Sequence, residues 1–247
     1  MENPSKSIGI VLSGGGSKGI AHAGALQFLT EKGMQPSCIA GTSAGAIVGG
    51  LFAFGKTPEE ILEFFKSIYF FHWKHFTFKK AGLIDSESFK SYFAEIFGDI
   101  TIGELKIPAY ITATDLVKGK LKIFNSETKL IDAILASSSF PGMLSPYEIN
   151  NKLYSDGGIL NHFPTDILQG RCDYLIGVYV SPIQKIEAKD FELFSINENI
   201  IKNISGHIGN LQVTVIDEEE EIVLNVSQIV WFDAKQIGLN QSGTFDP

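Results

Sequence analysis

Residues 41–45 read Gly-Thr-Ser-Ala-Gly and lie between two segments of different character. Residues 36–40 suit a short buried strand, and residues 44–54 combine alanine and glycine with the apolar spacing of a helix. This G-x-S-x-G pattern predicts that Ser43 lies on a sharp turn between a strand and a helix, where a serine can act as a nucleophile. Gly41 and Gly45 leave room for so crowded a turn. A glycine-rich turn at a close helix–strand contact explains the pentapeptide equally well.

The composition is that of a globular and fairly apolar protein. Of its 247 residues 44% are hydrophobic and 19% charged, so one large α/β domain or two small ones could each bury a core. No repeat, linker or clear boundary interrupts the chain, and we expect a single domain over residues 1–247. The net charge of −8 argues against a nucleic-acid partner held through its phosphates.

Short apolar runs alternate with helical spacing through most of the chain. This alternation predicts βαβ units and a mainly parallel central sheet sandwiched between helices, an α/β fold. The predicted strands cover residues 8–12, 36–40, 107–112, 121–124, 174–180 and 221–231. Residues 148–154 are predicted to form a strand pair or the edge of a hairpin. The predicted helices cover residues 20–32, 44–54, 58–67, 86–97, 130–138, 165–170 and 195–215.

The cysteines and the apolar runs bear on location. Cys38 and Cys172 both lie in strand-like apolar surroundings, so we expect buried free thiols and a reducing compartment. We expect no secretory leader before the first strand, and no apolar run reaches the ~18 residues of a membrane span. The expected location is cytoplasmic, either soluble or peripheral at a membrane.

A second glycine-rich loop, residues 14–19, reads Gly-Gly-Gly-Ser-Lys-Gly and follows the first predicted strand. It fits the dinucleotide-binding fingerprint, but the next strand does not end in the acidic residue that would bind a ribose. A phosphate-binding loop of the Walker type would need Lys and Ser or Thr after the last glycine, where Ile20 stands. Consecutive glycine N–H groups can instead cradle an oxyanion, and both loops would lie at the same edge of the sheet.

A nucleophilic serine needs a base, and the histidines are poorly placed for that role. They are His22, His72, His75, His162 and His207. Only His162 lies near other candidate groups, six residues after Asp156. An α/β-hydrolase would also place several strands before the nucleophile, whereas Ser43 follows only the second predicted strand.

A carboxylate is the alternative base. Asp156 precedes Gly157 and Gly158, which allow close approach of the backbone around it. A tight Asp-Gly turn is the commoner role of this dipeptide taken alone. Asp115, at the end of a predicted strand, is the other acid that could face the same edge.

Taken together and in this order, the motifs resemble those of the patatin-like phospholipase family. The resemblance covers about residues 8–181, and residues 182–247 look divergent or shortened. It rests on the loop 14–19, the pentapeptide 41–45 and the segment 156–158, and on agreeing landmarks at residues 82–85, 113–116, 136–142 and 156–164. One departure is Lys18, where the family commonly has Arg; lysine keeps the charge but not the planar fork.

The resemblance implies a three-layer α/β/α fold and a Ser–Asp dyad. Ser43 would be the nucleophile and Asp156 the base, without metal or cofactor. The oxyanion hole would be formed by N–H groups of Gly14, Gly15 and Gly16. Supporting motif residues would be Lys18, Gly19, Gly41, Gly45, Gly157 and Gly158.

The expected activity is hydrolysis of fatty-acyl esters of phospholipids or related lipids, as a carboxylic ester hydrolase of the phospholipase A type. An esterase or thioesterase acting on soluble substrates, and a non-catalytic lipid-binding protein, are the alternatives. Residues 69–80 are dense in aromatic side chains and end in two lysines, so they are a candidate for peripheral membrane contact. A helix or strand packed on the core, with its lysines in solvent, is the competing interpretation.

Overall fold

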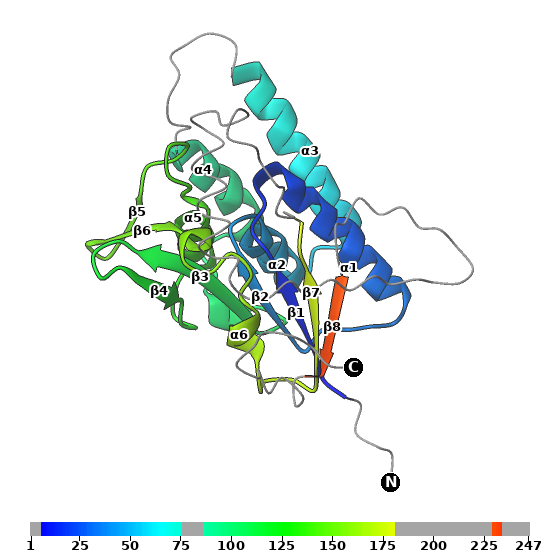
Figure 1. Cartoon of the computed structure of the whole chain (residues 1–247). Coiled ribbons are helices and arrows are strands. Elements are labelled where there is room, and N and C mark those ends of the chain that lie inside the picture. Colours follow the sequence, from blue (N-terminus) through cyan, green and yellow to red (C-terminus); the bar gives the residue numbers. More distant parts are fainter. Residues whose placement is uncertain (1–5, 76–85, 181–228, 234–247) are drawn as a thin grey trace, which may run out of the picture.

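The computed structural model describes residues 6–75, 86–180 and 229–233, and side chains within residues 6–67 and 89–180 (Figure 1). The strands are β1 (Ile8–Leu12), β2 (Cys38–Thr42), β3 (Ala109–Asp115), β4 (Lys120–Ile123), β5 (Tyr147–Ile149), β6 (Lys152–Asp156), β7 (Tyr174–Val178) and β8 (Ile229–Asp233). The α-helices are α1 (Ala21–Glu31), α2 (Ala44–Phe54), α3 (Pro58–His75), α4 (Ser86–Phe97), α5 (Leu130–Ser138) and α6 (Thr165–Leu168). Three 3-10 turns are η1 (Gly16–Ile20), η2 (Ile102–Glu104) and η3 (Gly157–Ile159).

All the strands join one sheet, in the order β5-β6-β3-β2-β1-β7-β8, with β4 added to β3. The central strands β3, β2, β1 and β7 are parallel to one another. The other strands pair antiparallel, β4 and β6 with β3, β5 with β6, and β8 with β7. The predicted parallel sheet is therefore confirmed at its centre, while antiparallel strands at both ends make the whole sheet mixed.

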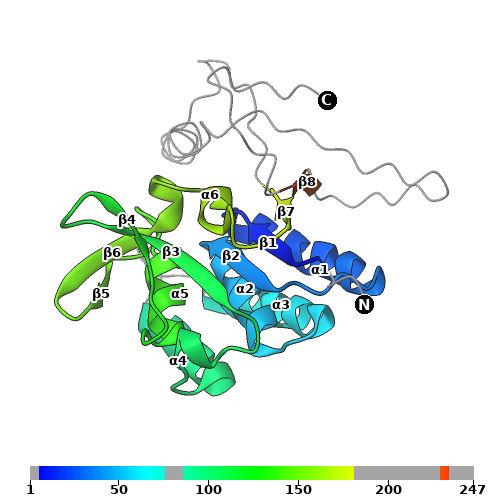
Figure 2. The same ribbon diagram turned by 90° about the horizontal axis from the view of Figure 1, so that it is seen from below.

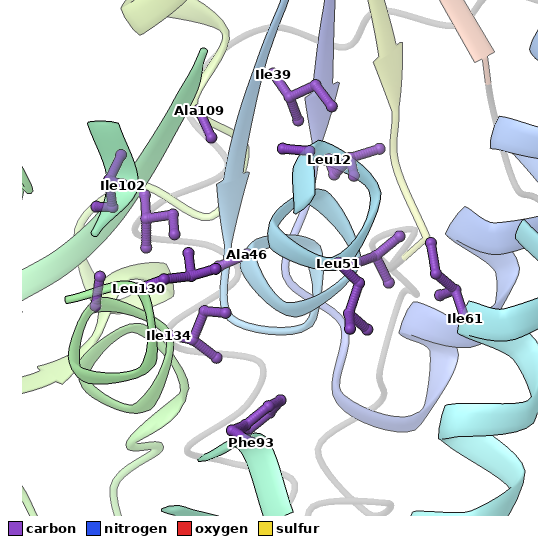
Figure 3. Packing of buried hydrophobic residues seen from close by; sticks show 14 of the residues in the cluster. Leu12, Ile39, Ala46, Leu51, Ile61, Phe93, Ile102, Ala109, Leu130 and Ile134 are labelled. Carbon is purple, nitrogen blue, oxygen red and sulfur yellow. The ribbon is translucent and has the colours of Figure 1, made fainter. Parts of the chain in front are cut away.

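Helices cover the two faces of this sheet unequally. Figure 2 shows α1 to α5 on one side of the sheet and α6 on the other, which confirms the α/β/α layering. The larger core lies between the sheet and α1, α2, α3, α4 and α5, where alternate residues of the strands, such as Ile10 and Leu12 on β1, are almost fully buried (Figure 3). A smaller core lies under α6 and includes Val11, from the opposite face of β1, and both cysteines. Cys38 and Cys172 are buried free thiols, as predicted.

Helix α2 lies at the centre of the larger core and depends on small residues. An added Cβ at Gly50 would lie 2.9 Å from the Ile134 Cδ1 atom on α5, so glycine lets the two helices pack closely. Ile134 itself is fully buried, and it lies beside α2 among the other core side chains (Figure 3). The contact between α2 and α5 holds the first residue of α2 in a constant position relative to the sheet.

Two strands share one edge of β3, and their ends meet there. Thr112 pairs with Thr42 on β2 and with Ile123 on β4, so β2 and β4 occupy opposite edges of β3. Ala113 pairs with β4 on one side and with Asp156 of β6 on the other. Since β4 occupies one edge of β3, β6 lies on the other edge, which is the edge that β2 occupies. Since β6 runs antiparallel to β3, β2 and β6 approach each other end to end. The last residue of β6 therefore lies one residue along β3 from the last residue of β2.

Several predicted boundaries differ from the observed ones. Helix α3 continues to His75, eight residues beyond the predicted end at 67, because the aromatic residues that follow are compatible with a helix. Part of the aromatic segment 69–80 is thus helical, but its side chains and residues 76–80 lie outside the described residues. The predicted helix over 195–215 also lies outside them, and of the predicted strand over 221–231 only the end falls within β8.

We predict that Ile134→Ala lowers the free energy of unfolding by about 2–5 kcal/mol, because it removes buried methyl groups and leaves a cavity between α5 and α2. Urea denaturation followed by circular dichroism measures the change. The control is Glu95→Ala on the exposed side of α4, where a surface substitution should change the free energy by less than about 0.5 kcal/mol. Equal effects of the two substitutions would contradict the packing described here.

Candidate active site

Ser43 lies on a strained turn between β2 and α2. Its backbone angles are φ 53° and ψ −120°, outside the regions that non-glycine residues usually adopt. The turn is held by the Ser43 N–H, which donates to the Ser137 Oγ atom at 2.8 Å. An added Cβ at Gly41 would lie 2.4 Å from the Gly45 carbonyl oxygen, and one at Gly45 would lie 2.2 Å from the Leu12 carbonyl oxygen. Both glycines are therefore required for the close crossing of α2 over β1 and β2.

Asp156 is buried at the end of β6, and its carboxylate lies close enough to the Ser43 hydroxyl for that group to lower the carboxyl pKa. The same carboxylate accepts the Gly158 N–H at 2.7 Å through Oδ1. The backbone of Asp156 is also held, because its N–H donates to the Ser139 carbonyl at 2.9 Å and its carbonyl accepts the Thr114 hydroxyl at 2.8 Å. The structure thus brings together the serine and the aspartate that the motifs single out.

Burial changes the acidity of this carboxyl group. Removal from water raises the pKa of Asp156 from its usual 3.8 to about 6, because the charged form loses its hydration. The hydrogen bonds from Ser43 and from the Gly158 N–H act in the opposite direction, since both stabilise the carboxylate. A buried carboxylate with a pKa near 6 is a better proton acceptor than an ordinary aspartate and is still largely ionised at neutral pH.

The glycines that follow Asp156 fit the junction of the two strands. An added Cβ at Gly157 would lie 2.6 Å from the Thr112 carbonyl oxygen, where β6 reaches the end of β2. One at Gly158 would lie 2.9 Å from Asp156 Oδ1. Side chains at these positions would push the carboxylate away from Ser43. The competing interpretation of a simple Asp-Gly turn does not explain why both glycines are crowded.

The glycine loop lies against the same site, but its three predicted donors are not equivalent. The Gly14 N–H donates to the His162 carbonyl at 2.9 Å, so it is already paired. Within the part of the chain that the structure describes, no acceptor faces the N–H groups of Gly15 and Gly16. Gly16 begins η1 with φ +54°, a conformation that suits glycine. The pairing of Gly14 with His162 removes one donor from the predicted set and leaves two.

The other motif residues of this loop have different surroundings. An added Cβ at Gly19 would lie 2.4 Å from the Ala44 Cβ, so η1 packs directly on the first residue of α2. Lys18 is exposed on η1. Asp115, the alternative acid, accepts the N–H groups of Val117 and Lys118 through Oδ1 at 3.1 and 2.9 Å. Its carboxylate therefore holds the turn between β3 and β4.

His22 supports the site in a way that the sequence reasoning missed. It is fully buried on α1, and its Nε2 atom lies 2.8 Å from the Ser13 carbonyl oxygen, to which it donates. Burial is the main reason why its pKa falls to about 4, so the ring is neutral at pH 7. The Ser13 hydroxyl in turn accepts the Val180 N–H at 3.0 Å. The position of His22 on the apolar face of a predicted helix was the available signal.

The family model for patatin-like phospholipases matches residues 10–168. The chain belongs to the patatin-like phospholipase family. This confirms the resemblance seen in the sequence, and the matched residues include Ser43, Asp156 and the glycine loop.

Curated patatin-like relatives are longer than this chain. An uncharacterised NTE family protein of Mycobacterium tuberculosis strain H37Rv is 33% identical over 201 residues, which are 76% of this chain and 53% of the relative. The lysophospholipase NTE1 of Candida glabrata is 29% identical over 190 residues, 72% of this chain and 11% of that protein. This patatin-like chain thus spans about half the length of the first of these relatives.

Among solved structures, VipD of Legionella pneumophila is similar to this patatin-like chain with a TM-score of 0.46 and 15% identity, over 76% of this chain and 49% of that one.

Among the described helices, none is both long and apolar enough to cross a membrane.

Asp156 and His22 titrate in the same pH range with opposite effects on stability. Because the pKa of Asp156 is raised, the folded chain binds more protons than the unfolded chain between pH 3.8 and about 6, and the contribution of Asp156 to stability falls as pH rises. Because the pKa of His22 is lowered, the unfolded chain binds more protons between about pH 4 and 6.5, and the contribution of His22 rises with pH.

We predict that the free energy of unfolding of Asp156→Asn rises relative to that of the wild type by roughly 2–3 kcal/mol between about pH 4 and pH 7. The reason is that the substitution removes the titration of Asp156, which lowers the stability of the wild type as the pH rises, and leaves the titration of His22 in place. Urea denaturation of both proteins across this range measures the difference in the free energy of unfolding, in which His22 cancels. A difference that does not change with pH would contradict a raised pKa at Asp156.

Proposed function

We propose that this chain hydrolyses acyl esters of lipids through a dyad of Ser43 and Asp156. The observation that carries the proposal is a buried carboxylate beside the Ser43 side chain, which itself lies on a strained turn at the start of a helix. Such a turn exposes a serine to substrate, and the adjacent carboxylate supplies the base. Membership of the patatin-like phospholipase family supports a lipid as the substrate class.

In the first step, Ser43 Oγ attacks the ester carbonyl carbon while its proton passes to the Asp156 carboxylate. The carbonyl oxygen becomes an oxyanion, which the N–H groups of Gly15 and Gly16 would stabilise; one such donor is typically worth about 2.7–4 kcal/mol. The positive end of α2, whose first residue follows Ser43, favours the same negative charge. The proton then passes to the departing alkoxide, which leaves as an alcohol.

In the second step, a water molecule replaces the alcohol. Asp156 takes a proton from this water as it attacks the acyl-serine carbonyl, and the same two N–H groups stabilise the second oxyanion. Ser43 Oγ leaves and recovers the proton from Asp156, and the free fatty acid is released. The carboxylate alternates between base and acid, so a pKa near 6 suits both roles at neutral pH.

We predict that Ser43→Ala and Asp156→Asn each lower kcat/KM by about a thousandfold or more, on a short-chain p-nitrophenyl ester and on a lysophospholipid, because each removes half of the dyad. A fluorophosphonate probe should label the wild type at Ser43, with loss of fluoride, and should not label Ser43→Ala. Mass spectrometry of the labelled peptide locates the adduct.

The matched control is Ser126→Ala, which changes an exposed serine in the loop before α5. This variant should retain wild-type rates and labelling. Activity that survives Ser43→Ala, in protein purified free of host esterases, would overturn the proposed dyad. Hydrolysis of the soluble ester without hydrolysis of the lysophospholipid would move the substrate class to soluble acyl esters.

We predict that kcat/KM rises about tenfold per pH unit below pH 6 and levels off above it, because only the ionised form of Asp156 accepts the proton of Ser43. Initial rates on the p-nitrophenyl ester at saturating and subsaturating concentrations give the profile. An inflection near pH 4 would contradict a raised pKa at Asp156, because it is the value of an ordinary aspartate.

A further inference from the structure

Exposed apolar side chains are concentrated on one part of the molecule. Among the residues whose exposure the structure describes, every large exposed hydrophobic residue falls between positions 116 and 160. These residues are Leu116, Val117, Ile123, Met143, Leu153 and Leu160. Val117 is the most exposed, at 71%, and it lies at the tip of the β3–β4 hairpin. Scattered apolar residues need no explanation, but a group of this kind marks an interaction site.

Four of these residues form what we call the hairpin surface, which consists of Leu116, Val117, Ile123 and Leu153. The Leu116 N–H donates to the Leu153 carbonyl at 3.0 Å, so the β3–β4 and β5–β6 hairpins are joined there. Ile123 pairs with Thr112 on β3. Because residues two apart on a strand share a face, Ile123, Leu116 and Leu153 lie on the same face of the sheet, with Val117 beyond them at the tip.

The tip is held in shape by hydrogen bonds within the β3–β4 hairpin. The Asp115 carboxylate accepts the N–H groups of Val117 and Lys118, and the Asp115 carbonyl accepts the Gly119 N–H at 2.8 Å. Gly119 adopts φ +62°, which closes the turn. Since the turn is already ordered, presenting Val117 to a partner would require little loss of conformational entropy.

Lysines lie at the tip and on the opposite face of the same two hairpins, in a protein that is otherwise acidic. Lys118, Lys120 and Lys122 lie on the β3–β4 hairpin and Lys152 begins β6, whereas the net charge of the chain is −8. Asp115 and Asp156, on the same strands, are buried. Of the acidic residues on β3, β4, β5 and β6, all of which the structure describes, Glu148 is the only one that is exposed. Lys122 precedes Ile123 on β4 and Lys152 precedes Leu153 on β6, so the hairpins carry apolar residues on one face and lysines on the other. An element with one apolar and one basic face is complementary to the surface of a membrane with anionic lipids.

We propose that the hairpin surface docks on the face of an anionic lipid bilayer and brings the active site to its substrate. This inference rests on the proposed function. Leu116 lies three residues beyond Ala113, the partner of Asp156, so Leu116 is about 10 Å along β3 from Asp156 at ~3.3 Å per residue. An interfacial segment enters the headgroup region by about 5–10 Å. Insertion of Val117 would therefore hold the dyad close to the level of the lipid esters.

The test measures binding of the Ser43→Ala protein to vesicles by sedimentation, so that hydrolysis does not alter the lipid. Vesicles of phosphatidylcholine with phosphatidylglycerol should bind the protein, and vesicles of phosphatidylcholine alone should bind it more weakly. Replacing both Leu116 and Val117 by Ser should lower the partition coefficient on the anionic vesicles by about tenfold or more. Replacing Lys118, Lys120 and Lys122 by Gln should lower it by about fivefold per lysine.

The charge-matched control replaces Lys32, Lys56 and Lys66 by Gln, on the side of α1 and α3, and should bind as the parent does. In the Ser43-containing protein, the Leu116 and Val117 substitutions should leave the rate on a soluble p-nitrophenyl ester unchanged and slow hydrolysis of vesicle lipid. Binding that these substitutions do not change would overturn the docking proposal, whether or not the dyad is active. Loss of binding without any esterase activity would support docking while contradicting the proposed function.

Two other binding partners of the hairpin surface can be distinguished by experiment. If the surface packs against another part of this chain, the Leu116 and Val117 substitutions should lower the melting temperature and leave vesicle binding unchanged. If a second copy covers it, sedimentation velocity should show a dimer that these substitutions dissociate. Either result would overturn the proposal.

Discussion

The end-to-end meeting of β2 and β6 on one edge of β3 is the constraint on which the site depends. Strand β2 pairs with this edge up to Thr42, and the chain turns away at Ser43. Strand β6 pairs with the adjacent part of the edge and ends at Asp156. Two residues that are more than a hundred positions apart are thereby placed beside the same pair of strand residues, Thr112 and Ala113. Backbone hydrogen bonds of the sheet, which are numerous and mutually supportive, thus determine the distance between the serine and the carboxylate.

This arrangement has an energetic cost that the rest of the fold must offset. The carboxylate is withdrawn from water, and Ser43 is held at a positive φ. The Ser137 and Gly158 contacts reduce this cost locally, since each satisfies a polar group at the junction. The large apolar core around α2 supplies the remaining stability, because Gly41, Gly45 and Gly50 let this helix pack closely on the sheet and on α5.

Much of the fold was predictable, because its parallel centre is built from short apolar strands that alternate with amphipathic helices. The predicted helix over 130–138 agrees with α5, and the strand before Ser43 is displaced by only two residues. The antiparallel position of β6 was not predictable, since it depends on pairing with β3 rather than on any local pattern. The helix α3 was predicted too short because a run of aromatic residues has no clear helical period.

For the site, local motifs placed Ser43 and Asp156 on suitable turns, but long-range contacts decided which neighbours matter. Nothing in the sequence of residues 14–16 distinguishes the three glycine N–H groups; the carbonyl that pairs with Gly14 comes from a distant loop. The roles of Ser137 and His22 were hidden for the same reason, because each contacts backbone atoms from another segment.

The pairing of Gly14 with His162 ties the loop that begins η1 to the loop that follows Asp156. An added Cβ at Gly14 would lie 2.7 Å from the His162 ring, so the two loops also contact each other through side-chain volume. A substitution at either position therefore displaces both the Gly15 and Gly16 N–H groups, which are the proposed oxyanion donors, and the segment that carries Asp156, the proposed base. Substitutions in the two loops are consequently not independent in their effects on the reaction. When one loop changes in sequence, the other must change with it.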